Sequence, residues 1–167
     1  QFGSSVVGKT FGPVMLVWFV FIGTIGAIHL AGNLSILKAI NPMYGANLLY
    51  EYPGGFWILG AVFLCTTGAE ALYSDLGHCG KSNIRMGWGF VKICLLLSYF
   101  GQGAWLLEHQ GQTLEGLGGV IPFFEIIPKP LLIFGVIIAT MATIIASQAL
   151  ISGTFTLVNE AMKLKLW

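Results

Sequence analysis

The residue with the clearest chemical signature is Glu70, a carboxylate within the otherwise uncharged residues 65–73. An ionised side chain inside a membrane-spanning segment is unfavourable by about 2.5–3.5 kcal/mol on insertion scales, and burial favours the protonated form of a carboxyl group. Such a group persists where it faces a cavity, pairs with another group or carries protons. We therefore predict that Glu70 serves proton and cation binding. The alternative is a solvated position at a helix end, beside Asp75.

The residues just before Glu70 weaken a straight helix. Thr66 and Thr67 are β-branched, and Gly68 lowers helix propensity further. A discontinuous helix at mid-membrane exposes carbonyls and hydroxyls that can replace the hydration shell of a cation. Thr67 and Glu70 are three residues apart and share a face if the helix continues. We predict Thr66, Thr67, Gly68 and Glu70 as the ion- and proton-binding residues; threonines bonded to preceding carbonyls are the alternative.

Polar residues in other apolar runs form a second set of candidates. Side chains of this kind at lipid depth should face protein, because hydrocarbon offers them no hydrogen-bond partner. Interhelical hydrogen bonding, or a packing seam of small polar residues, is their ordinary role. Lining of an ion path is the other role, for which the candidates in these runs are Tyr99, Gln102, Ser147, Gln148 and Ser152, together with Tyr73 from the run that holds Glu70.

Spanning helices are needed to position these residues, and composition favours them. Of 167 residues, 56% are hydrophobic and only 9% are charged, against about 25% charged in soluble domains. A spanning helix needs about 20 mostly apolar residues, and the apolar runs are too long for strands and lack period-two alternation. The sequence predicts an all-α membrane protein with helices at about 11–30, 55–73, 86–107 and 130–158. The second reaches spanning length only by continuing through Glu70.

Glycines are frequent inside these runs, where close helix packing is their ordinary role in a membrane. The glycines concerned are Gly23, Gly26, Gly60, Gly68, Gly101, Gly103, Gly135 and Gly153. Between the runs, residues 31–54 resemble an interfacial amphipathic stretch. Residues 109–129 are expected to form a polar cap followed by a short apolar turn on the membrane surface.

The distribution of Lys and Arg predicts the orientation. One side has five such residues at its boundaries, and the other has only Lys38 and Lys129. Cytoplasmic segments carry the excess of basic residues, so both ends and the 74–85 loop are expected to be cytoplasmic. The five residues on that side are Lys9, Lys81, Arg85, Lys163 and Lys165, with Lys92 just inside the third helix.

Other functional classes find little support. A net charge of +1 gives no strong electrostatic field that would attract nucleic acid. Asp75, His78 and Cys79 match no standard zinc spacing, and three irregularly spaced cysteines predict no disulfide framework. No phosphate-binding loop, dinucleotide fingerprint or nucleophile elbow is present in the sequence, so we expect no enzyme, no resident metal and no cofactor.

Several motifs in order resemble a known family. They are Phe11-Gly12-Pro13-Val14-Met15, Ala39-Ile40-Asn41-Pro42, Thr67-Gly68-Ala69-Glu70-Ala71-Leu72-Tyr73, Tyr99-Phe100-Gly101-Gln102-Gly103-Ala104 and Ile145-Ala146-Ser147-Gln148-Ala149. They resemble the fifth to eighth spanning helices of the KUP/HAK/KT family of potassium–proton symporters. By this resemblance residues 1–167 are a single transmembrane region, a central fragment of a larger transporter domain.

The resemblance implies a five-plus-five inverted-repeat fold and proton-coupled uptake of potassium by alternating access. Thr67 and Glu70 match family positions in the sixth helix associated with ion binding and proton coupling. The implied setting is the plasma (inner) membrane, with the bilayer and the remaining helices as partners, a homodimer left open, and only K⁺ and H⁺ as transported species. The alternatives are another solute transporter of the same superfamily or a four-helix membrane subunit that transports nothing.

Overall fold

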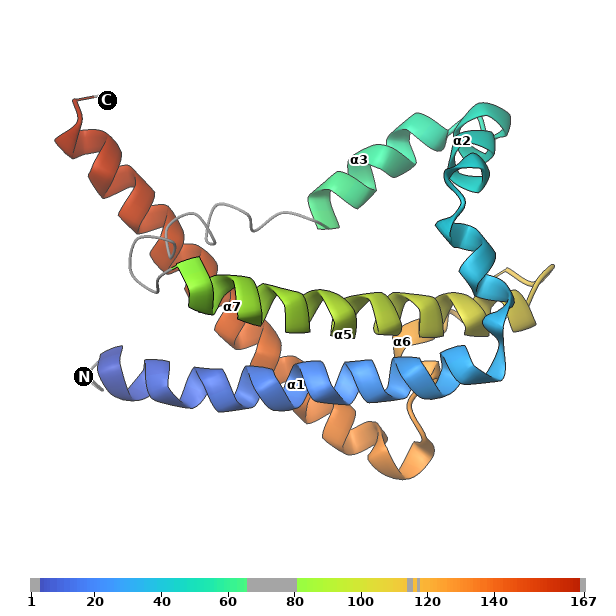
Figure 1. Cartoon of the computed structure of the whole chain (residues 1–167), viewed down its shortest axis with the longest axis horizontal. Coiled ribbons are helices and arrows are strands. Elements are labelled where there is room, and N and C mark those ends of the chain that lie inside the picture. The colour runs from blue at the N-terminus through green and yellow to red at the C-terminus, as the bar shows by residue number, and fades with distance from the viewer. Residues whose placement is uncertain (1–3, 66–80, 114–115, 117, 166–167) are drawn as a thin grey trace. The chain divides into compact units, whose positions relative to one another are not determined.

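The computed structural model describes residues 4–65, 81–113, 116 and 118–165, and all regular secondary structure in them is helical. In chain order the elements (Figure 1) are α1 (Ser4–Gly32), the 3-10 helix η1 (Leu34–Ile40), α2 (Pro42–Glu51), α3 (Gly55–Cys65), α5 (Lys81–Glu108), α6 (Pro122–Glu125), the 3-10 helix η2 (Lys129–Leu131) and α7 (Leu132–Lys163). They belong to two compact units, residues 1–37 with 86–146 and residues 38–85 with 147–167. The predicted all-α class is confirmed for the described residues.

Three helical stretches are long and apolar enough to cross a membrane: Phe11–Gly32, Ile84–Glu108 and Lys129–Lys163. They correspond to the first, third and fourth predicted helices. α1, α5 and α7 each extend several residues past a predicted boundary, because a helix that has formed adds polar flanking residues at little further cost. The second predicted helix, 55–73, begins as α3, and its remainder lies outside the described residues.

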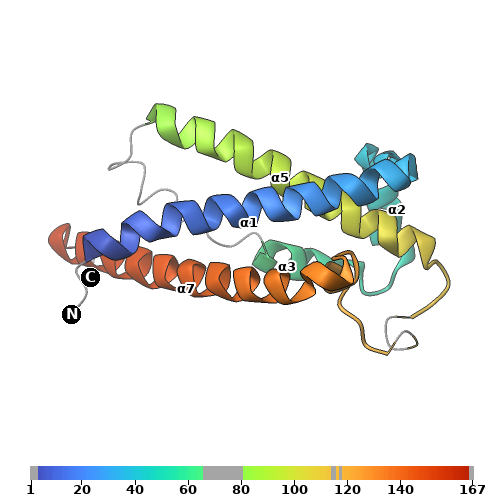
Figure 2. The same cartoon turned by 90° about the horizontal axis from the view of Figure 1, so that it is seen from below.

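Within the first unit, α1 and α5 run side by side in the same direction, whereas the part of α7 in this unit runs against them (Figures 1 and 2). The contacts give the same order, since Gly23 lies against Cys94 and the later Gly26 lies against Ser98. Parallel neighbours cannot be joined by a short turn, so a long connection separates them in the chain.

α1 and α5 approach closely where both helices carry glycine. A Cβ atom added to Gly101 would lie 2.6 Å from the Cα atom of Gly26, and one added to Gly26 would lie 2.6 Å from the Cα atom of Ser98. Both obstacles are backbone atoms, which cannot rotate away as a side chain can. The prediction that Gly26 and Gly101 serve helix packing is confirmed, in the manner expected of membrane helices.

The other glycines of the predicted set differ among themselves. Gly103 and Gly135 lie against side chains, at 2.8 and 2.9 Å from an added Cβ atom. Among the described residues, none lies within 4 Å of such an atom at Gly60, so the packing role is not seen there. Gly68 lies outside the described residues.

The segment that follows α5 belongs to the core of the first unit. Ile126 and Ile127 are only 2% and 5% exposed and cluster with Ile25 of α1. Pro122 starts α6 at its first turn, and the turn that follows directs both isoleucines inward. Both side chains therefore pack inside the first unit, against Ile25 of α1. The placement of this apolar turn at the membrane surface stays a prediction.

The second unit contains α2 and α3. Asn41 caps α2, because its side-chain oxygen accepts a hydrogen bond from the Met43 backbone N–H at 3.0 Å, and Pro42 follows the cap. α3 returns against α2 at Gly55, where an added Cβ atom would lie 2.9 Å from the Cα atom of Leu49. This contact joins the two short helices into a hairpin, and the interfacial placement of residues 31–54 stays a prediction.

Candidate functional site

The residues predicted to bind ions and protons fall between α3 and α5. Thr66, Thr67, Gly68, Glu70 and Tyr73 all lie outside the described residues. Their roles stay predictions, and the structure contributes the helices on either side of them. α3 leads into this stretch, and α5 leaves it at Lys81.

Two polar residues of α5, Ser98 and Gln102, are hydrogen-bonded to each other. Gln102 donates a hydrogen bond from Nε2 to the Oγ atom of Ser98 at 3.2 Å, one turn earlier in the same helix. Ser98 is only 3% exposed, whereas Tyr99 is 62% exposed. Gln102 is thus joined to Ser98 at the crossing with α1, and Tyr99 lies on another side of α5. The lining role of Tyr99 and Gln102 stays a prediction.

The candidates on α7 lie along its surface. Ser147, Gln148 and Ser152 are all exposed. The Ser152 backbone carbonyl accepts a hydrogen bond from Thr156 Oγ1 at 2.9 Å. Thr154 Oγ1 likewise donates a hydrogen bond to the Leu150 backbone carbonyl at 2.9 Å. A threonine hydroxyl bonded in this way has its hydrogen-bond partner within its own helix. The exposed side chains of Ser147, Gln148 and Ser152 remain available for hydrogen bonds to a neighbouring helix.

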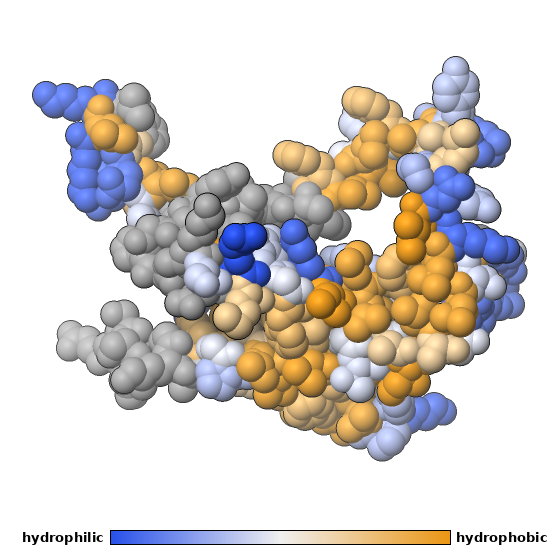
Figure 3. Space-filling view, in the orientation of Figure 1, coloured by the Kyte–Doolittle hydropathy of each residue, from blue (hydrophilic) through white to orange (hydrophobic). Residues whose placement is uncertain are grey.

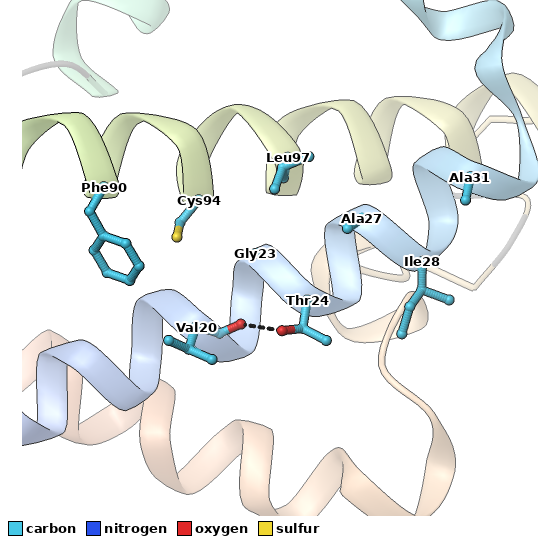
Figure 4. Close-up of a pocket in the computed structure, with 9 residues that line it drawn as sticks. All are labelled: Val20, Gly23, Thr24, Ala27, Ile28, Ala31, Phe90, Cys94 and Leu97. Carbon is cyan, nitrogen blue, oxygen red and sulfur yellow. Dashed lines mark hydrogen bonds between the residues drawn. The ribbon is translucent and has the colours of Figure 1, made fainter.

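An apolar groove runs along the α1–α5 crossing (Figure 4), with a volume of about 550 Å³. Six residues from α1 and three from α5 line it: Val20, Gly23, Thr24, Ala27, Ile28, Ala31, Phe90, Cys94 and Leu97. Its width follows from composition, since glycine and alanine on α1 leave space beside the larger side chains of α5. Phe90 and Cys94 point from α5 toward α1 across this space.

The groove has little capacity for ion chemistry. Thr24 supplies the hydroxyl in its lining, and that hydroxyl donates to the Val20 carbonyl at 2.7 Å. A desolvated cation needs several oxygen ligands, and this lining offers one side-chain hydroxyl and the Cys94 thiol. The lining therefore suits an apolar occupant, and the described residues here act as the scaffold beside the predicted ion site.

Each of the two described histidines is hydrogen-bonded to the backbone carbonyl four residues earlier in the chain. His29 Nδ1 lies 3.2 Å from the Ile25 carbonyl oxygen, and His109 Nδ1 lies 2.9 Å from that of Trp105. Because a carbonyl only accepts, each Nδ1 carries the proton. The His109 ring also stacks on Trp105 at 4.2 Å between centroids. Over the part of the chain that the structure describes, no three His, Cys, Asp or Glu residues group as metal ligands.

Sequence reasoning gave Ser98 less weight than the structure does. It is the buried polar residue found among the described side chains, and it lies at the point where α1 and α5 are closest. A signal for this was available: Cys94, Ser98 and Gly101 are small residues at helical spacing, which marks a contact face. The apolar residues Ile126 and Ile127 offered no comparable signal, because both lipid and protein can cover them.

Comparison with known proteins identifies relatives along the whole chain. Residues 1–167 match the family model described as the K⁺ potassium transporter integral membrane domain. The chain is 58% identical to the "Probable potassium transport system protein Kup" of Cytophaga hutchinsonii and 57% identical to that of Flavobacterium johnsoniae, over 100% of its length in both. It is 59% identical to the "Probable potassium transport system protein Kup 1" of Lactococcus lactis over 99% of its length.

These matches cover only part of each relative. The chain spans 26% of the Cytophaga and Flavobacterium proteins and 25% of the Lactococcus protein. No solved structure matches the chain. The family model nevertheless matches from the first residue to the last, and identity stays above half in all three relatives. The chain therefore belongs to the family of the K⁺ potassium transporter integral membrane domain.

Proposed function

We propose that this chain is part of a transporter that takes up potassium together with protons across the plasma (inner) membrane. The observation that carries the proposal is the family match over residues 1–167. The names of three relatives, each at least 57% identical, describe potassium transport systems. Three apolar helices of spanning length support the membrane location.

In the proposed mechanism, potassium binds among hydroxyls, carbonyls and carboxylates near the membrane midplane. Thr66, Thr67 and Gly68 supply oxygen ligands from a discontinuous helix, and Glu70 binds the coupled proton. Protonation of Glu70 changes the local charge and so biases the equilibrium between outward- and inward-facing states. Tyr73 is proposed to line the ion path beside this site.

We also propose four membrane crossings, and the direction of the helices supports this count. α1 and α5 run in the same direction, so the connection between them must return to the starting side of the membrane. The second predicted helix, at 55–73, is the candidate for that return. With α7 reversed, both ends of the chain then lie on one side, the cytoplasmic side by the distribution of Lys and Arg.

The remaining three-quarters of such a transporter would supply the other helices of a five-plus-five inverted-repeat fold. The exposed apolar side chains of α1, α5 and α7 offer area for those helices and for lipid. The exposed Ser147, Gln148 and Ser152 of α7 are proposed to face a polar neighbour or the ion path.

The test is Glu70→Gln in the full-length transporter, produced in a host that needs a potassium uptake system to grow at low potassium. Removing the ionisable group should abolish the pH dependence of potassium uptake while the protein remains in the membrane. Glu108→Gln, at the exposed end of α5, is the matched control and should transport normally. Unchanged pH-dependent uptake by Glu70→Gln would remove Glu70 from the coupling role, and no uptake by the unmodified protein would refute potassium transport.

A further inference from the structure

Trp88 and Lys92 form a pair one turn apart on α5. The Lys92 Nζ atom lies 5.2 Å from the centroid of the Trp88 ring, which is cation–π distance. Lys92 is exposed, and Trp88 is 39% exposed. The ion pair found among the described residues is Lys163–Glu160, so no described carboxylate neutralises Lys92. The pair thus presents an ammonium group and an indole N–H, which are both hydrogen-bond donors.

The depth of the pair in the bilayer follows from the span Ile84–Glu108, which has 25 residues. At 1.5 Å per residue this helix is about 37 Å long, longer than the roughly 30 Å hydrocarbon core. Lys92 lies eight residues after Ile84, so its backbone is about 12 Å from the start of the span. Trp88 lies one turn nearer the headgroups, where tryptophan is enriched.

The direction of the lysine side chain agrees with this depth. Helical side chains tilt toward the N-terminus of their helix, so Lys92 extends back toward Trp88 and the headgroups. In Figure 3, hydrophilic residues cover part of the N-terminal half of α5, directly beside hydrophobic residues. Lys92 lies on a different face of α5 from the one that contacts α1. Phe90 and Cys94, which line the groove, are each two residues from Lys92 and therefore point to the opposite side of the helix.

We propose that Trp88 and Lys92 bind the phosphate group of an anionic phospholipid in the leaflet at the N-terminal end of α5. The ammonium group has three donors, and contact with the indole ring leaves room for phosphate oxygens to accept from it. The indole N–H supplies a further donor, and no carboxylate among the described residues competes for the lysine. In the proposed orientation this is the cytoplasmic leaflet, whose anionic lipids attract basic side chains. The inference needs only that α5 spans the membrane and is independent of potassium transport.

Native mass spectrometry of the full-length protein tests this site with phosphatidylglycerol and phosphatidylcholine as probes. Lys92→Gln should weaken phosphatidylglycerol binding about fivefold, the effect of one basic residue at a membrane surface, and weaken phosphatidylcholine binding less, because its choline cation offsets the phosphate charge. Lys92→Arg should retain the affinity, because it keeps the charge and the stacking. The matched control is Lys129→Gln, which removes an exposed lysine outside α5 and should have no effect on this site.

A second variant keeps the test decisive if Lys92→Gln does not fold. Trp88→Phe retains an aromatic ring but removes the indole N–H, and it should also weaken phosphatidylglycerol binding. Equal affinity for phosphatidylglycerol in Lys92→Gln, or in Trp88→Phe where only that variant folds, would overturn the proposal. Displacement of the lipid by inorganic phosphate would also overturn it, because the ligand would then be a soluble anion.

Discussion

Gly26 of α1 faces the backbone of α5 at the point where the two helices are closest. Even one added methyl group meets backbone there, so the helices must separate. We predict that Gly26→Ala destabilises the full-length protein by about 1–3 kcal/mol, the usual range for overpacking. Thermal unfolding in detergent, followed by loss of the monodisperse species, measures the change.

The control for this prediction is Gly12→Ala in the same helix. A Cβ atom at Gly12 meets no other residue within 4 Å in the part of the chain that the structure describes, so this variant should be neutral or stabilised by up to about 1 kcal/mol through helix propensity. Equal stability of the two variants would show that the α1–α5 contact does not contribute to stability.

Single residues also show what sequence can and cannot predict. Gly26 and Gly101 were identified as packing residues because glycine inside an apolar run has few other roles. Their pairing with each other was not predictable, since helical spacing gives a face but not the partner of that face. For Glu70 the sequence supplies the only information, because the residue lies outside the described part of the chain.

At the scale of elements, α6 and the turn after it anchor the first unit. Ile126 is 2% exposed, whereas Ile121, just before α6, is 59% exposed. We predict that Ile126→Ala destabilises the protein by about 2–5 kcal/mol, because it leaves a cavity in the core. Ile121→Ala should stay within about 0.5 kcal/mol of the unmodified protein. Unfolding in detergent would again measure both, and an Ile126→Ala variant as stable as Ile121→Ala would contradict a core role for Ile126.

The elements themselves were largely predictable from hydropathy. Lengths of about 20 apolar residues identified α1, α5 and α7, because a spanning helix is bounded by membrane thickness. Their ends were less predictable, since helices extend into polar flanks. The burial of Ile126 and Ile127 was not predicted, because isoleucine suits the membrane surface and a protein core equally well, and only tertiary contacts distinguish the two.

For the whole molecule, the parallel direction of α1 and α5 predicts which loops share a side. After replacement of the three native cysteines, Ser35→Cys and Thr113→Cys should react from outside the cell with a membrane-impermeant maleimide. Ser82→Cys should react only after the membrane is permeabilised, because in the proposed topology the chain has crossed back to the cytoplasmic side before residue 82. Labelling of Ser35→Cys and Ser82→Cys from the same side of the membrane would refute the proposal of four membrane crossings.

The contact between Gly26 and Ser98 also constrains how the chain is made. Its two sides are about 70 residues apart, and ribosomes add roughly 5–20 residues per second. α1 is therefore synthesised roughly 4 to 14 seconds before the part of α5 that its glycines contact. During that interval lipid tails or an insertion chaperone must cover the glycine face, and slowing translation between the two helices should prolong the exposure of a nascent chain to degradation.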